Sequence, residues 1–119
     1  VLAYSPLAQG LLTGKVGPDR EFPEDDLRHD APLFSRESRI RVARMLDEIR
    51  PIAEARGMTL AQLIISWTIA QPGLTHALVG ARNPRQAKEN ARAGDVALSP
   101  DEIDAIAKAV ARYEADAPE

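Results

Sequence analysis

The stretch His76 to Asn90, which reads HALVGARNPRQAKEN, contains the clearest structural signals of this chain. A short apolar run, Ala77 to Val79, ends at Gly80, and Asn83 then stands directly before Pro84. Asparagine is a favoured N-cap and proline suits the first position of a helix, so the stretch predicts a strand, a tight turn and a capped helix. Such a junction points free N–H groups and the positive end of a helix dipole at one place, which suits an anion.

Two arginines lie at this junction. Arg82 falls in the predicted turn and Arg85 in the first turn of the predicted helix. Both side chains can add fixed positive charge and forked donors for a phosphate group. The alternative is that the junction binds nothing and that its arginines are solvated.

Composition narrows the classes of protein that remain. The chain has 119 residues, 45% of them hydrophobic, a net charge of −3 and no cysteine. This profile is that of one ordinary small domain, and it argues against a nucleic-acid partner and against a membrane surface. No apolar run approaches the ~20 residues of a membrane span, and the absence of cysteine fits a cytoplasmic location.

The first third of the chain reads as one short strand followed by a long loop. Residues 1–4 form an apolar run, which predicts the end of a buried strand. Residues 5–15 contain two glycines and are expected to be an irregular loop, and residues 16–34 show no period, so they are expected to be a loop as well. Long loops are usually either functional or disordered, so a lid over a ligand and a flexible insert both remain open. Asp25 and Asp26 are expected to be solvated rather than to bind a metal, since no further ligands accompany them.

Three more helices follow from capping signals. Ser35 is a candidate N-cap, Thr59 with Gln62 has capping-box spacing, and Ser99 with Glu102 has the same spacing. The helix after Thr59 is apolar on nearly all sides and should be buried on more than one side.

Two details of these helices can be predicted as well. Pro51 interrupts the first helical pattern and predicts a kink or a break there. The last helix should present one apolar face, formed by Ile103, Ile106, Ala107 and Val110.

The order of elements indicates an α/β fold, mostly helical with two short parallel strands. Both strands read as buried on both faces, yet two strands alone leave two open edges. We therefore expect further strands before Val1, in which case the chain is the C-terminal portion, about the last two β/α units, of a TIM (β/α)₈ barrel. Barrels of this kind often bind phosphate with the loops after strands seven and eight.

Two motifs carry a resemblance to a known family. YSPLAQGLLTGK, at Tyr4 to Lys15, and GARNPRQAKEN, at Gly80 to Asn90, together resemble the C-terminal part of an NADP-dependent aldo-keto reductase. The helices between and after them resemble the family in order and spacing. The resemblance implies that residues 1–119 are the C-terminal, cofactor-binding part of a single barrel domain, and that the parent protein reduces aldehydes or ketones with NADPH.

The resemblance assigns one group of residues to the nicotinamide and pyrophosphate end of the cofactor. Tyr4 corresponds to the aromatic residue that stacks on the nicotinamide ring. The positions that correspond to the surroundings of the pyrophosphate are Ser5, Leu7, Gln9, Gly10 and Lys15.

A second group is assigned to the adenosine end. Gly80 lies in the turn, Arg82 and Gln86 match positions near the 2′-phosphate, and the adenine edge is assigned to Glu89 and Asn90. Residues three and four apart share one face of a helix, so the last three side chains are expected to lie together. An arginine suits a dianionic phosphate.

The chain also departs from the family pattern. Many members carry a Lys-Ser pair and a later Arg where this chain has Gly80, Ala81 and Gln86. A preference for NADP over NAD therefore rests largely on Arg82, helped by Lys15 or Arg28.

The catalytic residues of the family correspond to positions upstream of this chain. Its Asp, Tyr, Lys and His have no counterpart here, and neither His29 nor His76 matches the catalytic histidine. The chain alone is expected to be inactive. A non-catalytic, NADP-binding regulatory or interaction module is one alternative, and a helical interaction domain without a ligand is another.

Overall fold

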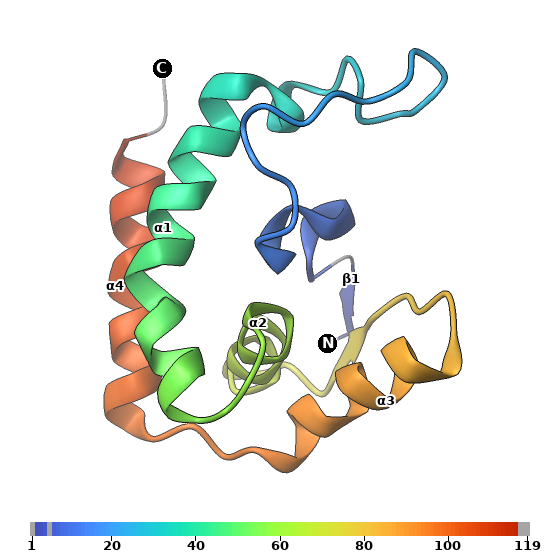
Figure 1. The fold of residues 1–119 in the computed structure, drawn as a ribbon. Coiled ribbons are helices and arrows are strands. Elements are labelled where there is room, and N and C mark those ends of the chain that lie inside the picture. Colours follow the sequence, from blue (N-terminus) through green and yellow to red (C-terminus); the bar gives the residue numbers. More distant parts are fainter. Residues whose placement is uncertain (1, 5, 117–119) are drawn as a thin grey trace.

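Two short parallel strands bring the start of the chain next to the segment that begins at His76. The computed structural model describes residues 2–4 and 6–116, and for Tyr4 and Gln9 it describes the backbone only. Strand β1 (Leu2–Tyr4) pairs with β2 (His76–Leu78), with Leu2 opposite His76 and Tyr4 opposite Leu78. Parallel strands need a long crossover, which the intervening helices provide (Figure 1). The predicted mostly helical fold with two short parallel strands is confirmed.

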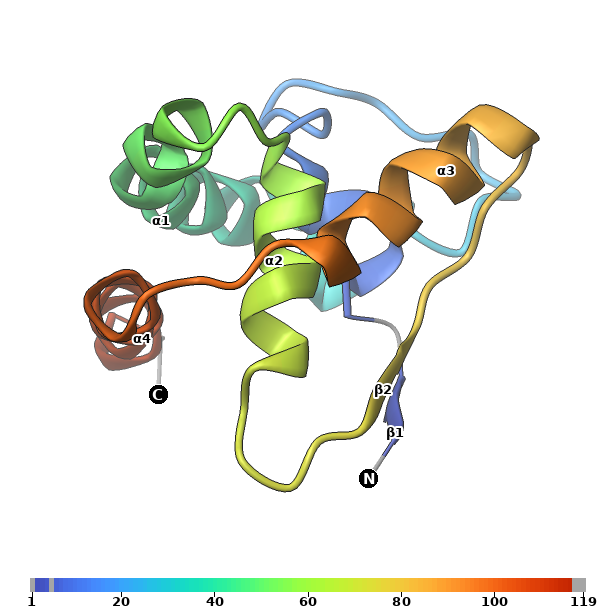
Figure 2. The same cartoon turned by 90° about the horizontal axis from the view of Figure 1, so that it is seen from below.

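The remaining elements are helices arranged around a central one. Figures 1 and 2 show α1 and α4 side by side and antiparallel, with α2 between this pair and α3. The elements and their bounds are η1 (Ala8–Thr13), η2 (Pro32–Phe34), α1 (Arg36–Ala55), α2 (Leu60–Ile69), α3 (Pro84–Arg92), η3 (Ala93–Asp95) and α4 (Pro100–Ala115).

The predicted capping signals all start helices. The Ser35 hydroxyl accepts from the Ser38 N–H at 3.1 Å at the start of α1. Both capping boxes are complete, with Thr59 and Gln62 before α2 and with Ser99 and Glu102 before α4. Each box satisfies two backbone groups that a helix start leaves free, which is why such local signals can be read without the tertiary structure.

Of the kink or break predicted at Pro51, the break is wrong, because α1 continues through the proline. The helix runs from Arg36 to Ala55 with the proline inside it. The missing N–H costs one backbone bond. The neighbouring side chains of Ile49 and Ala53 are both buried in the core, and their packing holds the helix across the proline.

The core lies between α1, α2, α4 and η1. Its largest fully buried side chains are Leu11, Ile49, Leu63 and Ile106. The apolar face of α4 differs from the predicted one at a single position, because Ala107 is exposed and Ala109 is buried in its place. The buried face thus follows Ile106, Ala109 and Tyr113 at spacings of three and four, and it packs on α1.

The prediction that both strands are buried on both faces is wrong. Leu2 is 58% exposed and Leu78 is 50% exposed. Within the described residues the sheet has only these two strands, so each has one unpaired edge and little packs over its faces. The apolar sequence of the strands predicts that both faces are buried, but two paired strands cannot cover each other's faces.

An ion pair joins the end of α1 to the start of α4. Arg56 donates to both carboxylate oxygens of Glu102, with its Nε 2.9 Å from Oε2. This pairing, together with the backbone N–H of Ser99, lowers the pKa of Glu102 from 4.5 to about 2. The stabilisation is therefore complete above pH 4.5 and is lost as the pH falls toward 2.

Glu102→Gln should flatten the acid limb of the stability curve. The free energy of unfolding of the unaltered chain should fall between pH 4.5 and 2 more steeply than that of the variant, as measured by urea unfolding followed by circular dichroism. Asp104→Asn, which removes an exposed pair with Lys108 on the same helix, is the matched control. Equal slopes for the unaltered chain and Glu102→Gln would contradict the assignment.

Candidate functional site

The turn after β2 is held by the helix that follows it. The Asn83 side chain accepts from the Gln86 N–H at 2.9 Å and caps α3, as predicted. The Gln86 side chain in turn accepts from the Arg82 N–H at 2.8 Å, and the Asn90 amide donates to the Gly80 carbonyl at 3.2 Å. Both ends of the turn are thereby fixed to α3, while the Arg82 side chain remains exposed.

The segment after β1 is ordered rather than irregular. The expectation of an irregular loop over residues 5–15 is wrong for residues 8–13, which form η1. The Leu7 carbonyl accepts from the N–H groups of Gly10 and Leu12 at 3.1 and 3.2 Å, and Gly10 adopts a φ of +92°. This left-handed conformation favours glycine, and it lets Leu11 enter the core.

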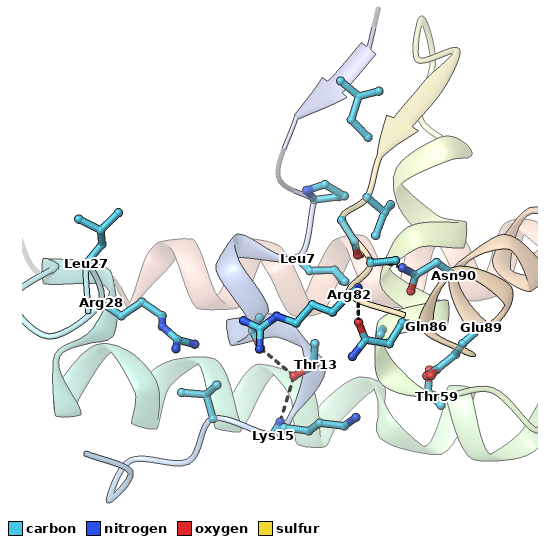
Figure 3. Close-up of a pocket in the computed structure, with 18 of the residues that line it drawn as sticks. Leu7, Thr13, Lys15, Leu27, Arg28, Thr59, Arg82, Gln86, Glu89 and Asn90 are labelled. Carbon is cyan, nitrogen blue, oxygen red and sulfur yellow. Dashed lines mark hydrogen bonds between the residues drawn. The ribbon is translucent and has the colours of Figure 1, made fainter. Parts of the chain in front are cut away.

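An open cleft of about 1060 Å³ lies between η1, α3 and the loop over residues 16–31 (Figure 3). All predicted site residues whose side chains or glycine positions are described line this one cleft, namely Leu7, Gly10, Lys15, Gly80, Arg82, Gln86, Glu89 and Asn90. Ser5 lies outside the described residues, and the side chains of Tyr4 and Gln9 do so as well. His29 and His76 do not line the cleft.

The side chains around the cleft carry more positive than negative charge. Its cationic lining residues are Lys15, Arg20, Arg28 and Arg82, and its acidic ones are Asp26 and Glu89. In Figure 3 the side chains of Arg82 and Arg28 point toward one another from opposite sides of the cleft. Like charges placed in this way are stabilised by an anion between them, so the cleft suits an anionic ligand.

Arg28 is the better neutralised of these two arginines. Its Nη2 and Nε lie 2.7 and 3.0 Å from the two carboxylate oxygens of Asp26. These hydrogen bonds lower the pKa of Asp26 to about 2, so the pair is ionised at neutral pH. Arg82 forms no ion pair with any residue that the structure describes.

The loop over residues 16–31 is anchored, which decides against a flexible insert. Phe22 is buried and meets Phe34 edge to face, with ring centroids 5.6 Å apart. The guanidinium groups of Arg20 and Arg28 lie 5.2 and 4.5 Å from the Phe22 ring centroid. Arg39 of α1 donates to the Gly17 carbonyl at 2.8 Å and so attaches the loop to α1.

Sequence reasoning missed several residues of the cleft wall. These are Thr13, Arg20, Asp26, Leu27, Thr59 and Ala61. The one available signal was Phe22, a single aromatic residue in a charged loop, which indicates an anchor in the core. Nothing local told which neighbouring side chains the anchored loop would present to the cleft.

In the described part of the chain, no group of three or more His, Cys, Asp or Glu residues is arranged to hold a metal ion. None of the helices in residues 2–4 and 6–116 is long and apolar enough to cross a membrane.

The fold and the cleft define part of a TIM (β/α)₈ barrel. The structure of the glycerol dehydrogenase from Gluconobacter oxydans is similar with a TM-score of 0.86 and 34% sequence identity, over 100% of this chain and 36% of that one. A model of the aldo/keto reductase family matches residues 1–111. The chain therefore belongs to the aldo/keto reductase family.

Two curated relatives show the range within the family. The NADH-specific methylglyoxal reductase of Escherichia coli is 35% identical over 83% of this chain and 30% of its own length. A probable voltage-gated potassium channel subunit beta of Arabidopsis thaliana is 34% identical over 90% of this chain and 34% of its own length. The chain spans about a third of the length of the curated relatives that it matches.

Gly14, at the end of η1, should not accept a side chain. Its φ is +79°, and a Cβ there would lie 2.8 Å from Cδ1 of the buried Leu60. Gly14→Ala should lower the free energy of unfolding by about 1–3 kcal/mol in urea titrations. Gly17→Ala is the control, because a Cβ there meets nothing within 4 Å. Equal stability of the two variants would contradict this reading.

Proposed function

We propose that this chain supplies the NADP(H)-binding part of an aldo-keto reductase that reduces aldehydes or ketones to alcohols. Residues 1–119 then form the C-terminal, cofactor-binding portion of one barrel domain. The observation that carries the proposal is the shared cleft, in which the motif after β1 and the motif after β2 face one another although they are far apart in sequence. Membership of the aldo/keto reductase family supports it.

The residues present fit such a cofactor. The pyrophosphate would lie against η1, near Leu7, Gly10 and Lys15, and the 2′-phosphate would lie against Arg82 and the capped N-terminus of α3. The side chains of Glu89 and Asn90 would meet the adenine edge, where a carboxylate and an amide complement an amine and ring nitrogens.

The cleft's own residues bind and orient rather than react. When bound, the nicotinamide ring supplies a hydride to the carbonyl carbon of the substrate. No residue of this chain is assigned a proton transfer, because the family's acid–base residues correspond to positions upstream of it. The chain thus contributes cofactor binding and leaves proton transfer to residues outside it.

The choice of NADP over NAD depends on Arg82. One relative is NADH-specific by its name, so membership of the family does not decide the point. Arg82 is exposed in the cleft and unpaired among the described residues, which leaves its full charge for a 2′-phosphate. Lys15 and Arg28 add positive charge to the same cleft.

Arg82→Ala should remove the preference for the 2′-phosphate. The variant should bind adenosine 2′,5′-bisphosphate roughly 10- to 100-fold more weakly than the unaltered chain, with little change for adenosine 5′-monophosphate, in calorimetric titrations. Arg85→Ala is the matched control, since Arg85 is exposed in the first turn of α3, three residues after Arg82, but does not line the cleft. Equal losses for both ligands would argue against 2′-phosphate recognition.

The chain by itself should not reduce carbonyl compounds. Mixed with NADPH and a simple aldehyde such as methylglyoxal, it should oxidise the cofactor no faster than buffer does, as followed by NADPH fluorescence. The physical reason is that the proposed role assigns no general acid to this chain, and a positioned general acid contributes about 10²–10⁴-fold to such reactions. A rate that rises in proportion to the chain concentration would refute this expectation.

A second function has one observation in its favour. The similarity to a channel subunit beta supports a non-catalytic module that keeps the cofactor site. Both functions predict binding of adenosine 2′,5′-bisphosphate, so binding does not separate them. They separate in the protein that contains the whole barrel, where the reductase alone turns over NADPH with an aldehyde.

A further inference from the structure

The helix that carries the adenosine-side residues is weakly embedded. α3 contributes no buried side chain to the core. The polar side chains of Gln86 and Asn90 form their hydrogen bonds with the turn just before the helix, at Arg82 and Gly80. These bonds shape α3 and its turn as one piece, but they do not attach that piece to the rest of the protein.

Two buried side chains of α2 make that attachment. The Gln62 Nε2 donates to the Glu89 carbonyl at 2.9 Å, and the Ser66 hydroxyl donates to the Ala93 carbonyl at 2.7 Å. Gln62 is 6% exposed and Ser66 is 2% exposed. They stand one turn apart on α2, so they form two parallel links to the end of α3 and the start of η3.

The carbonyl groups at the end of α3 need such donors. The last four carbonyl groups of an α-helix have no partner in the helix, and that of Glu89 is one of them. The N–H of Ala93 donates to the Asn90 and Ala91 carbonyls instead. Gln62 therefore completes the C-terminal end of α3, while its own Oε1 accepts from the Thr59 N–H at 3.0 Å in the capping box of α2.

The link through Gln62 ends on a residue of the cleft itself. The backbone of Glu89 accepts the bond, and the side chains of Glu89 and Asn90 line the cleft on the other side of the same helix turn. A buried hydrogen bond of this kind fixes the backbone because the alternative is an unsatisfied donor in the core.

We propose that Gln62 and Ser66 are positioning residues for the adenosine end of the cleft: they hold α3 so that Glu89 and Asn90 are in place before a ligand arrives. The inference rests on the proposed function for its ligand. The anchoring itself is independent of that function and can be measured without a ligand.

The ligand test uses three variants of the whole chain. Ser66→Ala and Gln62→Met should each weaken the binding of adenosine 2′,5′-bisphosphate roughly tenfold in calorimetric titrations of folded protein. Thr68→Val is the matched control, because the Thr68 hydroxyl donates at 2.7 Å to the Ile64 carbonyl within α2 and does not reach α3. It should bind as the unaltered chain does, and a similar loss in Thr68→Val would overturn the inference.

A double-mutant cycle separates positioning from a general loss of stability. If Gln62 acts through Glu89, then Gln62→Met should weaken binding much less when Glu89→Ala is already present. Additive losses would overturn the proposed route through Glu89. Ser66→Ala can replace Gln62→Met in the same cycle with Glu89→Ala, and it leaves the capping box of α2 intact.

Hydrogen exchange tests the anchoring without a ligand. The amides of residues 85–95 should exchange faster in Ser66→Ala and Gln62→Met than in Thr68→Val, while those of residues 101–115 should not change. Unchanged exchange in both variants would overturn the inference. If the exchange changes as expected but the unaltered chain does not bind adenosine 2′,5′-bisphosphate, then the anchoring holds and the proposed function, with its adenosine site, is wrong.

Discussion

Helix α2 is buried on all sides over its first seven residues, and the surrounding elements pack around it. Residues 60–66 are buried without interruption, so the helix has no solvent face over most of its length. Its apolar side chains join the core shared with α1 and α4, and Leu60 closes against Gly14 at the end of η1. Its two buried polar side chains, Gln62 and Ser66, turn toward α3 and η3. Because η1 and α3 both pack on α2, two of the three walls of the cleft are positioned by the way this helix is buried.

The parts of the fold that sequence predicts are those whose cause is local. A capping box satisfies backbone groups within four residues, so the starts of α2 and α4 could be read directly. The course of α1 across Pro51 depends instead on the burial of Ile49 and Ala53 against other helices, and no local rule contains that packing. The predicted burial of the two strands was wrong for a related reason. Their apolar composition predicts burial, but two paired strands cannot cover one another, and half of Leu78 is exposed.

The same distinction divides the candidate site. The positions on α3 could be predicted because residues three and four apart must share a helix face, and Gln86, Glu89 and Asn90 do line one cleft. The opposite wall could not be predicted, since it depends on contacts between segments distant in sequence. Arg39 of α1 donates a hydrogen bond to the Gly17 carbonyl in the loop, and Phe22 packs in the core beside Phe34. These contacts help to bring Arg20 and Arg28 to the cleft.

The positive charge that the cleft offers to a ligand depends on which of its arginines already form an ion pair with a carboxylate. Asp26 is ionised across the neutral range, and its hydrogen bonds with Arg28 lower its pKa further, to about 2, so this pair adds a dipole but little net charge. Arg28 also rests on the face of Phe22, which keeps it at the rim of the loop. Arg82 has neither constraint among the described residues: its backbone is fixed by Gln86, while its guanidinium group is exposed. Arg82 therefore has its full charge available for an anion, and because its backbone is already fixed only its side chain has to be ordered on binding. Under the proposed function, Arg82 is therefore the residue that should discriminate between adenosine with and without a 2′-phosphate, even though Arg28 lies in the same cleft.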